Sequence, residues 1–179
     1  MLAFASESGA DVWPELTELH QRHWLETEAA RHGQPFAPRL DRYHEYERIG
    51  WYVLFTARDG EKLVGNLGVY FAPSMHTQEL IATEDTLFLL PEYRRGHNAI
   101  DFIKFVEVEC WKRGVVEISI TAKNDKVGKL LMHLDFQPTS VQYSKQKRGA
   151  DSAVSLAAVT ENVNVLPNAS PDDQAGRLP

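Results

Sequence analysis

Apolar side chains recur every three or four residues near the beginning of the chain, which is the spacing of one face of an α-helix. Asp11 is placed to cap the N-terminus of this helix, and Gly33 is placed to end it. After a break that contains glycine and proline, residues 41–48 read as a second, shorter helix. The pattern therefore predicts two helices before the first strong strand. The face of the first helix is marked by Trp13, Leu16, Leu19, His20 and Trp24.

Two runs rich in β-branched, aromatic and aliphatic residues follow at positions 51–57 and 62–71. The Asp-Gly dipeptide at 59–60 is typical of a tight turn, so we expect the two runs to form an antiparallel hairpin. Within the second run, Gly65 and Gly68 indicate a bulge or a close approach of another chain segment.

A third strand, at residues 86–90, is apolar on both faces and is therefore expected at the centre of the sheet. It ends at Pro91, which cannot donate a ladder hydrogen bond. A helix at 97–111 and a strand at 115–121 follow, and this order forms a crossover that places the two strands parallel in one sheet. The predicted α/β pattern is completed by a helix at 124–134 and a strand at 136–143.

The length and composition favour one globular domain, which we expect at residues 1–147. Residues 148–179 are then a C-terminal extension. Within the extension, residues 153–159 are compatible with a strand, whereas residues 167–179 have the composition of a disordered segment.

The charge and cysteine content restrict the class of protein. The 179 residues carry a formal net charge of −6, which makes nucleic acid an unfavoured partner. Cys110 is the single cysteine, so an internal disulfide and a cysteine-based zinc cluster are excluded. The N-terminus lacks the basic segment of a secretory signal, and no apolar run reaches the ~20 residues of a membrane-spanning helix. We therefore expect a cytoplasmic protein with no membrane association.

The segment between the third strand and the next helix carries the sharpest functional signal. The first amides of a helix have no internal partner and, with the helix dipole, they favour a phosphate. A glycine in such a turn lets the backbone approach the anion closely, and arginines add charge-assisted hydrogen bonds. The alternative is a surface turn with two solvated arginines. The segment reads Arg94-Arg95-Gly96-His97-Asn98-Ala99.

The order of predicted elements, together with this turn, resembles the GNAT superfamily of N-acetyltransferases over roughly residues 1–147. In that family a pattern close to Arg/Gln-x-x-Gly-x-Gly/Ala cradles the pyrophosphate of CoA. Arg94 and Ala99 match its ends, whereas Gly96 lies one position early and His97 occupies the place of the inner glycine. This displaced form is similar to variants in phage-encoded members, which would place the protein in the host cytoplasm.

The resemblance implies a mixed central sheet with an antiparallel N-terminal part, splayed parallel strands and flanking helices. It also implies acetyl-CoA as co-substrate, with its pyrophosphate at residues 94–99. The pantetheine arm would pair with the backbone of Phe88 and Leu89, beside a splayed strand at 115–121. The implied reaction is direct attack of an amine on the thioester.

A second partial match lies further along the chain, where the family often carries Asn-x-x-Ala-x-x-Leu-Tyr-x-x-x-Gly-Phe. Asn124 opens this match and is a candidate cofactor contact; Leu131 and Asp135 depart from it. Leu131 stands at the place of the family's general-acid tyrosine, and Asp135 at the place of its glycine. The usual proton donor to the CoA thiolate is therefore missing. The positions in register are Asn124, Val127, Leu130 and Phe136.

Few side chains remain as candidate acids and bases. Glu84 and Asp85 open the predicted central strand on opposite faces, so at most one points toward the acceptor, and either is equally a solvated strand-end acid. His76, in the preceding loop, is a further candidate base, although a surface role is the simpler interpretation. Tyr143 and His133 are candidates for the missing acid if either reaches the sulfur, and otherwise pack.

The acceptor is open: a small-molecule amine, a protein lysine or a protein N-terminus. Glu45, Glu47 and Glu79 would form an acidic lining that suits a cation, or are solvated surface. His20 and His23 lack companion ligands at readable spacing, so no metal is expected and both are interpreted as partly exposed. A homodimer, a non-catalytic CoA-binding module and an acyltransferase acting on a modified nucleobase stay as alternatives.

Overall fold

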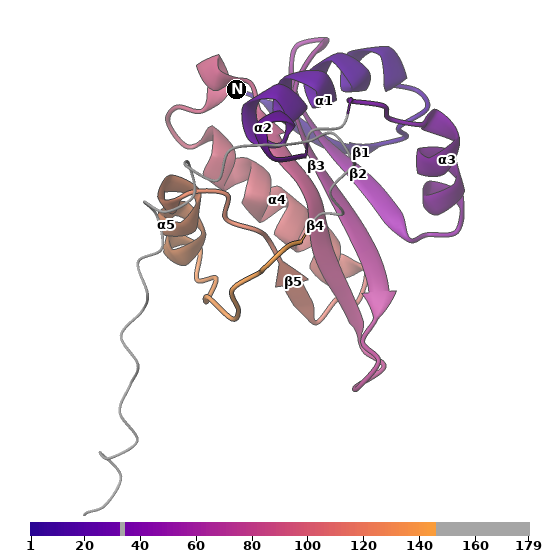
Figure 1. Cartoon of the computed structure of the whole chain (residues 1–179), viewed down its shortest axis with the longest axis vertical. Helices are drawn as coiled ribbons and strands as arrows, with labels where there is room; N and C mark the ends of the chain where they lie inside the picture. The colour runs from indigo at the N-terminus through magenta and orange to yellow at the C-terminus, as the bar shows by residue number, and fades with distance from the viewer. Residues whose placement is uncertain (33–34, 146–179) are drawn as a thin grey trace, which may run out of the picture. The chain divides into compact units, whose positions relative to one another are not determined.

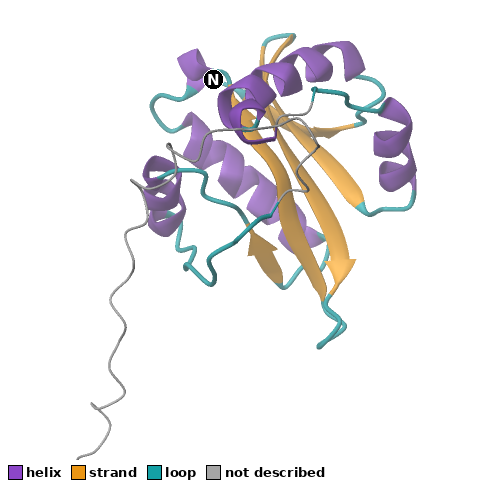
Figure 2. Cartoon of the chain, in the orientation of Figure 1, coloured by secondary structure: helices purple, strands orange, loops and turns teal. Residues whose placement is uncertain are grey.

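The computed structural model describes residues 1–32 and 35–145, which form a five-stranded sheet with helices on both of its faces (Figures 1 and 2). Neighbouring strands follow one another in chain order. The first four are antiparallel, and the last pair is parallel, as the predicted crossover requires. The strands are β1 (Ala3–Glu7), β2 (Tyr52–Asp59), β3 (Lys62–Pro73), β4 (Leu80–Leu89) and β5 (Glu117–Ser119).

The helices agree in number and order with the sequence pattern, apart from a short extra one after the first. The first begins at Trp13 rather than Asp11, with Val12 at the N-cap position and no side-chain cap, so the prediction that Asp11 caps it is wrong. Proline in its first turn starts the helix instead, because its missing N–H needs no partner there. The helices are α1 (Trp13–Thr27), α2 (Ala29–His32), α3 (Leu40–Arg48), α4 (Asn98–Lys112) and α5 (Asp125–His133).

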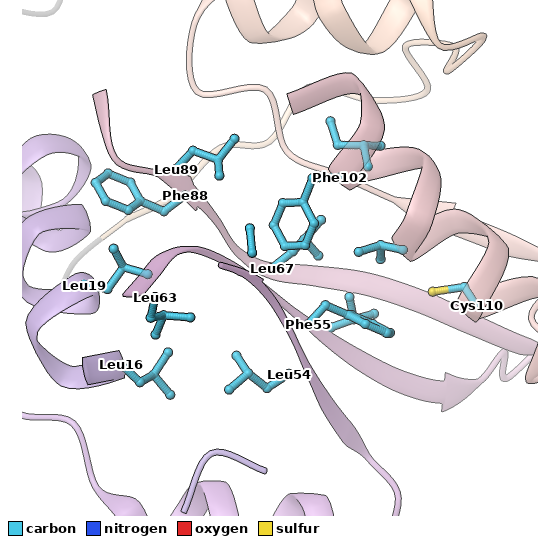
Figure 3. Close-up of a cluster of buried hydrophobic side chains, with 14 of the residues drawn as sticks. Leu16, Leu19, Leu54, Phe55, Leu63, Leu67, Phe88, Leu89, Phe102 and Cys110 are labelled. Carbon is cyan, nitrogen blue, oxygen red and sulfur yellow. The ribbon is translucent and has the colours of Figure 1, made fainter. Parts of the chain in front are cut away.

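The core lies on both faces of the sheet (Figure 3). On one face Phe55 of β2 packs with α4, where Phe102 and Cys110 are fully buried. On the other face Leu16 and Leu19 of α1 are buried with strand residues. Each large apolar side chain buried in this way stabilises the fold by about 1.5–3 kcal/mol relative to exposure.

The two glycines of β3 allow close approaches, as the sequence predicts. A Cβ at Gly65 would lie 2.3 Å from a methyl of Leu89, and a Cβ at Gly68 would lie 2.0 Å from the Tyr52 hydroxyl. The register between β3 and β4 also shifts beside Gly68, so the predicted bulge is confirmed.

The sequence pattern missed one strand, and three of the strands that it predicted need correction. The sequence pattern missed β1, a short edge strand whose side chains are mostly exposed. The strand predicted at 136–143 is wrong: Pro138 lacks an N–H, and residues 136–145 adopt no regular structure. The strand predicted at 115–121 shrinks to β5, and the strand predicted at 86–90 begins earlier, at the start of β4. The predicted extension at 148–179 lies outside the described residues.

Candidate functional site

The basic turn lies where the sequence places it, directly before α4. Gly96 has φ +61°, a left-handed conformation that glycine adopts without the penalty of a Cβ. His97 is the N-cap residue of α4, and its side chain makes no capping bond. Within residues 1–32 and 35–145, no group accepts a hydrogen bond from the backbone amides of residues 95–100, or pairs with the Arg95 side chain. The turn therefore presents free donors and an unpaired cation to an anion.

Two neighbouring side chains hold the turn in shape. Arg94 donates from Nε to the Leu89 carbonyl at 2.7 Å, and its guanidinium lies 4.9 Å from the centre of the Phe88 ring. The same guanidinium forms two bonds with Glu26 of α1, at 2.5 and 2.7 Å. Asn98 donates from its side chain to the Tyr93 carbonyl at 3.0 Å, and Ala99 is half-buried behind it. Arg94 and Asn98 thus brace the turn, whereas Arg95 is the cation left available.

The predicted splay of the parallel strands is present. β4 and β5 pair over three residues only, and the last pair is Thr83 with Ser119. Beyond it, Glu84 accepts a hydrogen bond from the Thr121 amide at 3.2 Å. The remainder of β4, which includes Phe88 and Leu89, has no partner strand on this edge among the described residues. An extended polar ligand could therefore add along this edge in the way that a strand does.

Asp85 is the bulged residue of β4. Gly68 of β3 pairs with Thr86 and Val69 pairs with Glu84, so Asp85 has no partner across the ladder. A bulge interrupts the strict alternation of side chains on which the opposite-face argument rested. Burial raises the pKa of Asp85 to about 6, and the positive charge of Lys123 limits the rise. A carboxyl group with this pKa can both take and release a proton near neutral pH.

Glu84 has a different environment. Burial raises its pKa, while the hydrogen bond from Thr121 and the charge of Lys123 oppose the rise. Since its carboxylate already binds a backbone amide, Glu84 ties the splayed strands together. Asp85 is thus the better placed of the two to meet a substrate.

The other predicted acids and bases are not brought to Asp85. His76 lies in the exposed loop before Leu80, and the five residues from there to Asp85 span roughly 16 Å along β4. Tyr143 is 90% exposed in a segment without regular structure. His133 is exposed at the end of α5.

The second partial match has a structural explanation. Asn124 is the N-cap of α5, and its side-chain oxygen accepts from the Val127 amide at 3.1 Å. Asp135 has φ +65°, the conformation for which a glycine is suited at the end of a helix. Leu131 is 5% exposed and belongs to the core rather than to the site.

The three glutamates predicted to line the acceptor site do not form a shared acidic lining: two already bind other groups, and the third lies in an exposed loop. Glu47 accepts a hydrogen bond from the Gly9 amide at 2.8 Å. Glu45 pairs with Arg42 at 2.9 Å on the surface of α3. Glu79 follows β3 in the same exposed loop as His76.

A buried polar line, which the sequence analysis missed, crosses the face of the sheet covered by α1. His20 Nε2 lies 3.0 Å from the side-chain nitrogen of Asn66, and His20 Nδ1 lies 3.3 Å from the Tyr43 hydroxyl. Asn66 also donates to Thr86 at 2.8 Å, directly beside Asp85. Burial lowers the pKa of His20 to about 4, so the imidazole is neutral at pH 7. The expectation that His20 and His23 are partly exposed is wrong, because both face the core.

Two further observations concern metal binding and membrane-spanning helices. Within the described ranges, no group of three or more His, Cys, Asp or Glu side chains is arranged to hold a metal ion. In the same part of the chain, the helices are too short or too polar to cross a membrane.

Comparisons with known proteins show the fold. No protein-family model matches the chain, and no curated protein matches its sequence. Similar solved structures include a ribosomal-protein-alanine N-acetyltransferase from Brucella melitensis biovar Abortus 2308 (17% identity, TM-score 0.65), covering 83% of this chain and 99% of that one. A predicted acetyltransferase from Clostridium acetobutylicum, solved with acetyl-CoA, is 12% identical with a TM-score of 0.62. This match covers 82% of this chain and 96% of that one.

A third similar structure is the aminoglycoside acetyltransferase AAC(6')-Iy, solved with a bisubstrate analogue that contains CoA. It is 17% identical, with a TM-score of 0.65, and the match covers 83% of this chain and 99% of that one. The chain therefore has the fold of the GNAT acetyltransferases, as the sequence predicted.

Proposed function

We propose that this chain is an N-acetyltransferase that uses acetyl-CoA as the acetyl donor. The observation that carries the proposal is the free-amide turn at residues 95–100 next to the unpaired edge of β4. The turn would hold the pyrophosphate, and the backbone of Phe88 and Leu89 would pair with the pantetheine arm. Asn124, whose side-chain nitrogen is not used in capping α5, is a further donor on this side. The acetyl-CoA and CoA analogue bound by similar structures support this assignment.

Asp85 is the proposed base. Its carboxylate removes a proton from the acceptor ammonium, and the amine nitrogen then attacks the thioester carbonyl carbon. As the C–N bond forms, the C–S bond breaks and its electron pair leaves with the CoA sulfur. The attacking nitrogen loses its second proton in this step, and that proton neutralises the thiolate directly or through solvent. The reaction therefore needs no side chain as proton donor. This agrees with the position of the family's general-acid tyrosine being held by Leu131, which is buried in the core.

A non-catalytic CoA-binding module is the second candidate, and the absence of a tyrosine at Leu131 favours it. The two candidates differ in one measurement. Acetyl-CoA is expected to raise the melting temperature in both, because it binds the folded state. Only the transferase releases CoA thiol when amines are added.

The proposed function is tested with the purified chain, acetyl-CoA and a panel of small amines and lysine-containing peptides. We expect a higher melting temperature with acetyl-CoA and thiol release with at least one amine. A higher melting temperature without thiol release would identify the binding module. No change in melting temperature would overturn both candidates.

Replacing Glu26 with glutamine is expected to tighten acetyl-CoA binding about two- to fivefold. The Glu26 carboxylate competes with phosphate for the Arg94 guanidinium, and partly exposed pairs of this kind contribute modestly. Isothermal titration measures the affinity, and Glu18→Gln, which removes an exposed pair with Arg22 on the same helix, is the control. Weaker binding by Glu26→Gln would mean that Arg94 binds best when braced by α1.

For the acceptor we propose only the general class, an amine. Similar structures include enzymes named for aminoglycosides and for ribosomal-protein alanine, so a small amine, a protein lysine or a protein N-terminus are all compatible with the fold. We place the transferase in residues 1–147 and treat residues 148–179 as an extension. A homodimer, a cytoplasmic location and a phage origin stay predictions from the sequence.

A further inference from the structure

Four aromatic rings form a continuous row from the interior near Asp85 to the surface. We call Tyr46, Trp51, Tyr52 and Tyr70 the aromatic row. Tyr52 and Tyr70 are paired across β2 and β3, with ring centres 5.1 Å apart. Tyr46 of α3 lies 6.1 Å from Tyr70 and 6.3 Å from Trp51. Tyr52 is 2% exposed and Tyr46 is half-buried, whereas Tyr70 is 38% and Trp51 57% exposed.

The inner end of the aromatic row lies beside Asp85. Tyr70 pairs with Thr83, two residues before Asp85 on β4, and the Tyr52 hydroxyl lies against Gly68 at the bulge. Burial, followed by the Asp85 carboxylate, raises the pKa of Tyr70 to about 12. The register therefore places Asp85 and Tyr70 near one another on the adjacent strands β4 and β3.

Within residues 1–32 and 35–145, Asp85 forms no hydrogen bond or ion pair, unlike the other carboxylates around it. Glu84 binds the Thr121 amide, Glu47 binds the Gly9 amide and Glu45 pairs with Arg42. The nearby cation Lys123 pairs with Glu28 at 2.9 Å; its charge also acts on Asp85, but among the described residues it forms no ion pair with Asp85. One carboxylate beside a row of rings is complementary to one ammonium group joined to a flat apolar body.

We propose that the acceptor is an arylalkylamine, with its ammonium group at Asp85 and its ring against Tyr70, Tyr46 and Trp51. The proposal rests on the proposed function and specifies its substrate class. A polyamine or an aminoglycoside carries several charges and would need several free carboxylates. An aryl ring needs none, and it gains contact with each exposed ring of the row.

The test compares phenethylamine with n-butylamine and spermidine, using thiol release from acetyl-CoA by the full chain. We expect phenethylamine to have the highest kcat/KM. Trp51→Leu and Tyr70→Leu should each raise the KM for phenethylamine roughly tenfold, the size of one lost aromatic contact. The KM for acetyl-CoA and the KM for n-butylamine should change by less than about threefold. Trp111→Leu, which removes a ring 44% exposed on α4, is the matched control and should change neither.

The outcomes separate this inference from the proposed function. Faster turnover of spermidine, or an equal effect of Trp51→Leu on all amines, would overturn the inference and leave the transferase standing. If no amine releases thiol, the transferase is wrong, and phenethylamine binding is measured by isothermal titration. Binding that does not depend on Trp51 or Tyr70 would then overturn the inference as well.

Discussion

Replacing Asp85 with asparagine is expected to lower kcat by roughly 10²- to 10⁴-fold at pH 7, the range that a positioned base contributes. In the wild-type chain the rate should rise with pH through about 6 and level off above it, because the deprotonated carboxylate is the active form. In Asp85→Asn this rise should disappear. Thiol release measured from pH 5 to pH 8 provides the profile.

The stability of Asp85→Asn serves as the control for its folding. The ordinary pKa of an aspartate is 3.8, whereas burial raises the pKa of Asp85 to about 6. Between these values the folded chain holds a proton that the unfolded chain releases, so the free energy of unfolding falls as pH rises from about 4 to about 6. Asparagine removes this loss, and we expect Asp85→Asn to be more stable than wild type at pH 7 by about 1–3 kcal/mol.

Glu84→Gln separates the two neighbouring carboxyl groups. It should keep the pH profile of the wild type, because the role of Glu84 is to accept the Thr121 amide across the splayed strands. If Glu84→Gln abolishes the rise in rate and Asp85→Asn does not, the assignment of the base is wrong. If both variants keep the profile, the base lies elsewhere or acts through water.

Reversing the charge of the turn, in Arg94→Glu with Arg95→Glu, is expected to raise the Kd for acetyl-CoA about 100-fold or more. Two charge-assisted hydrogen bonds are lost, and two carboxylates then face the phosphates. Arg95→Glu alone should account for most of the loss, since Arg95 is the unpaired cation whereas Arg94 already binds Glu26. Isothermal titration measures the affinity.

The matched controls are a second ligand and a second variant. S-acetylpantetheine has no pyrophosphate, so its weaker binding should be the same in wild type and in the double variant. Lys104→Glu reverses an exposed charge further along α4 and should leave acetyl-CoA affinity nearly unchanged. Unchanged acetyl-CoA affinity in the double variant would remove the turn from the binding site.

The sequence predicted the fold where apolar periodicity is strong. The hairpin of β2 and β3, the crossover through α4 and the helix α5 each have several apolar positions in register, and all three are confirmed. β1 was missed because an exposed edge strand of five residues offers too few alternating positions. The strand expected at 136–143 failed because alternation alone does not show whether a neighbouring strand is present to pair with it.

The candidate site was predictable only where it is local in the chain. The turn at 94–99 is contiguous, so its glycine, its arginines and the helix that follows can be read together. The aromatic row gathers residues from α3, the turn after α3, β2 and β3, and the packing of α3 together with the register of β2 and β3 brings them together. The bulge at Asp85 is a matter of register as well. His20 was misplaced because helical spacing alone does not tell a buried imidazole from an exposed one.

The burial of Leu131 also limits which side chains residue 131 can hold. A tyrosine at residue 131 would have to bring a larger side chain and a hydroxyl group into packed core, with a cost in stability. A tyrosine at residue 131 therefore requires the side chains around α5 to repack. Under the proposed mechanism, the proton that neutralises the thiolate comes instead from the reacting nitrogen or from solvent.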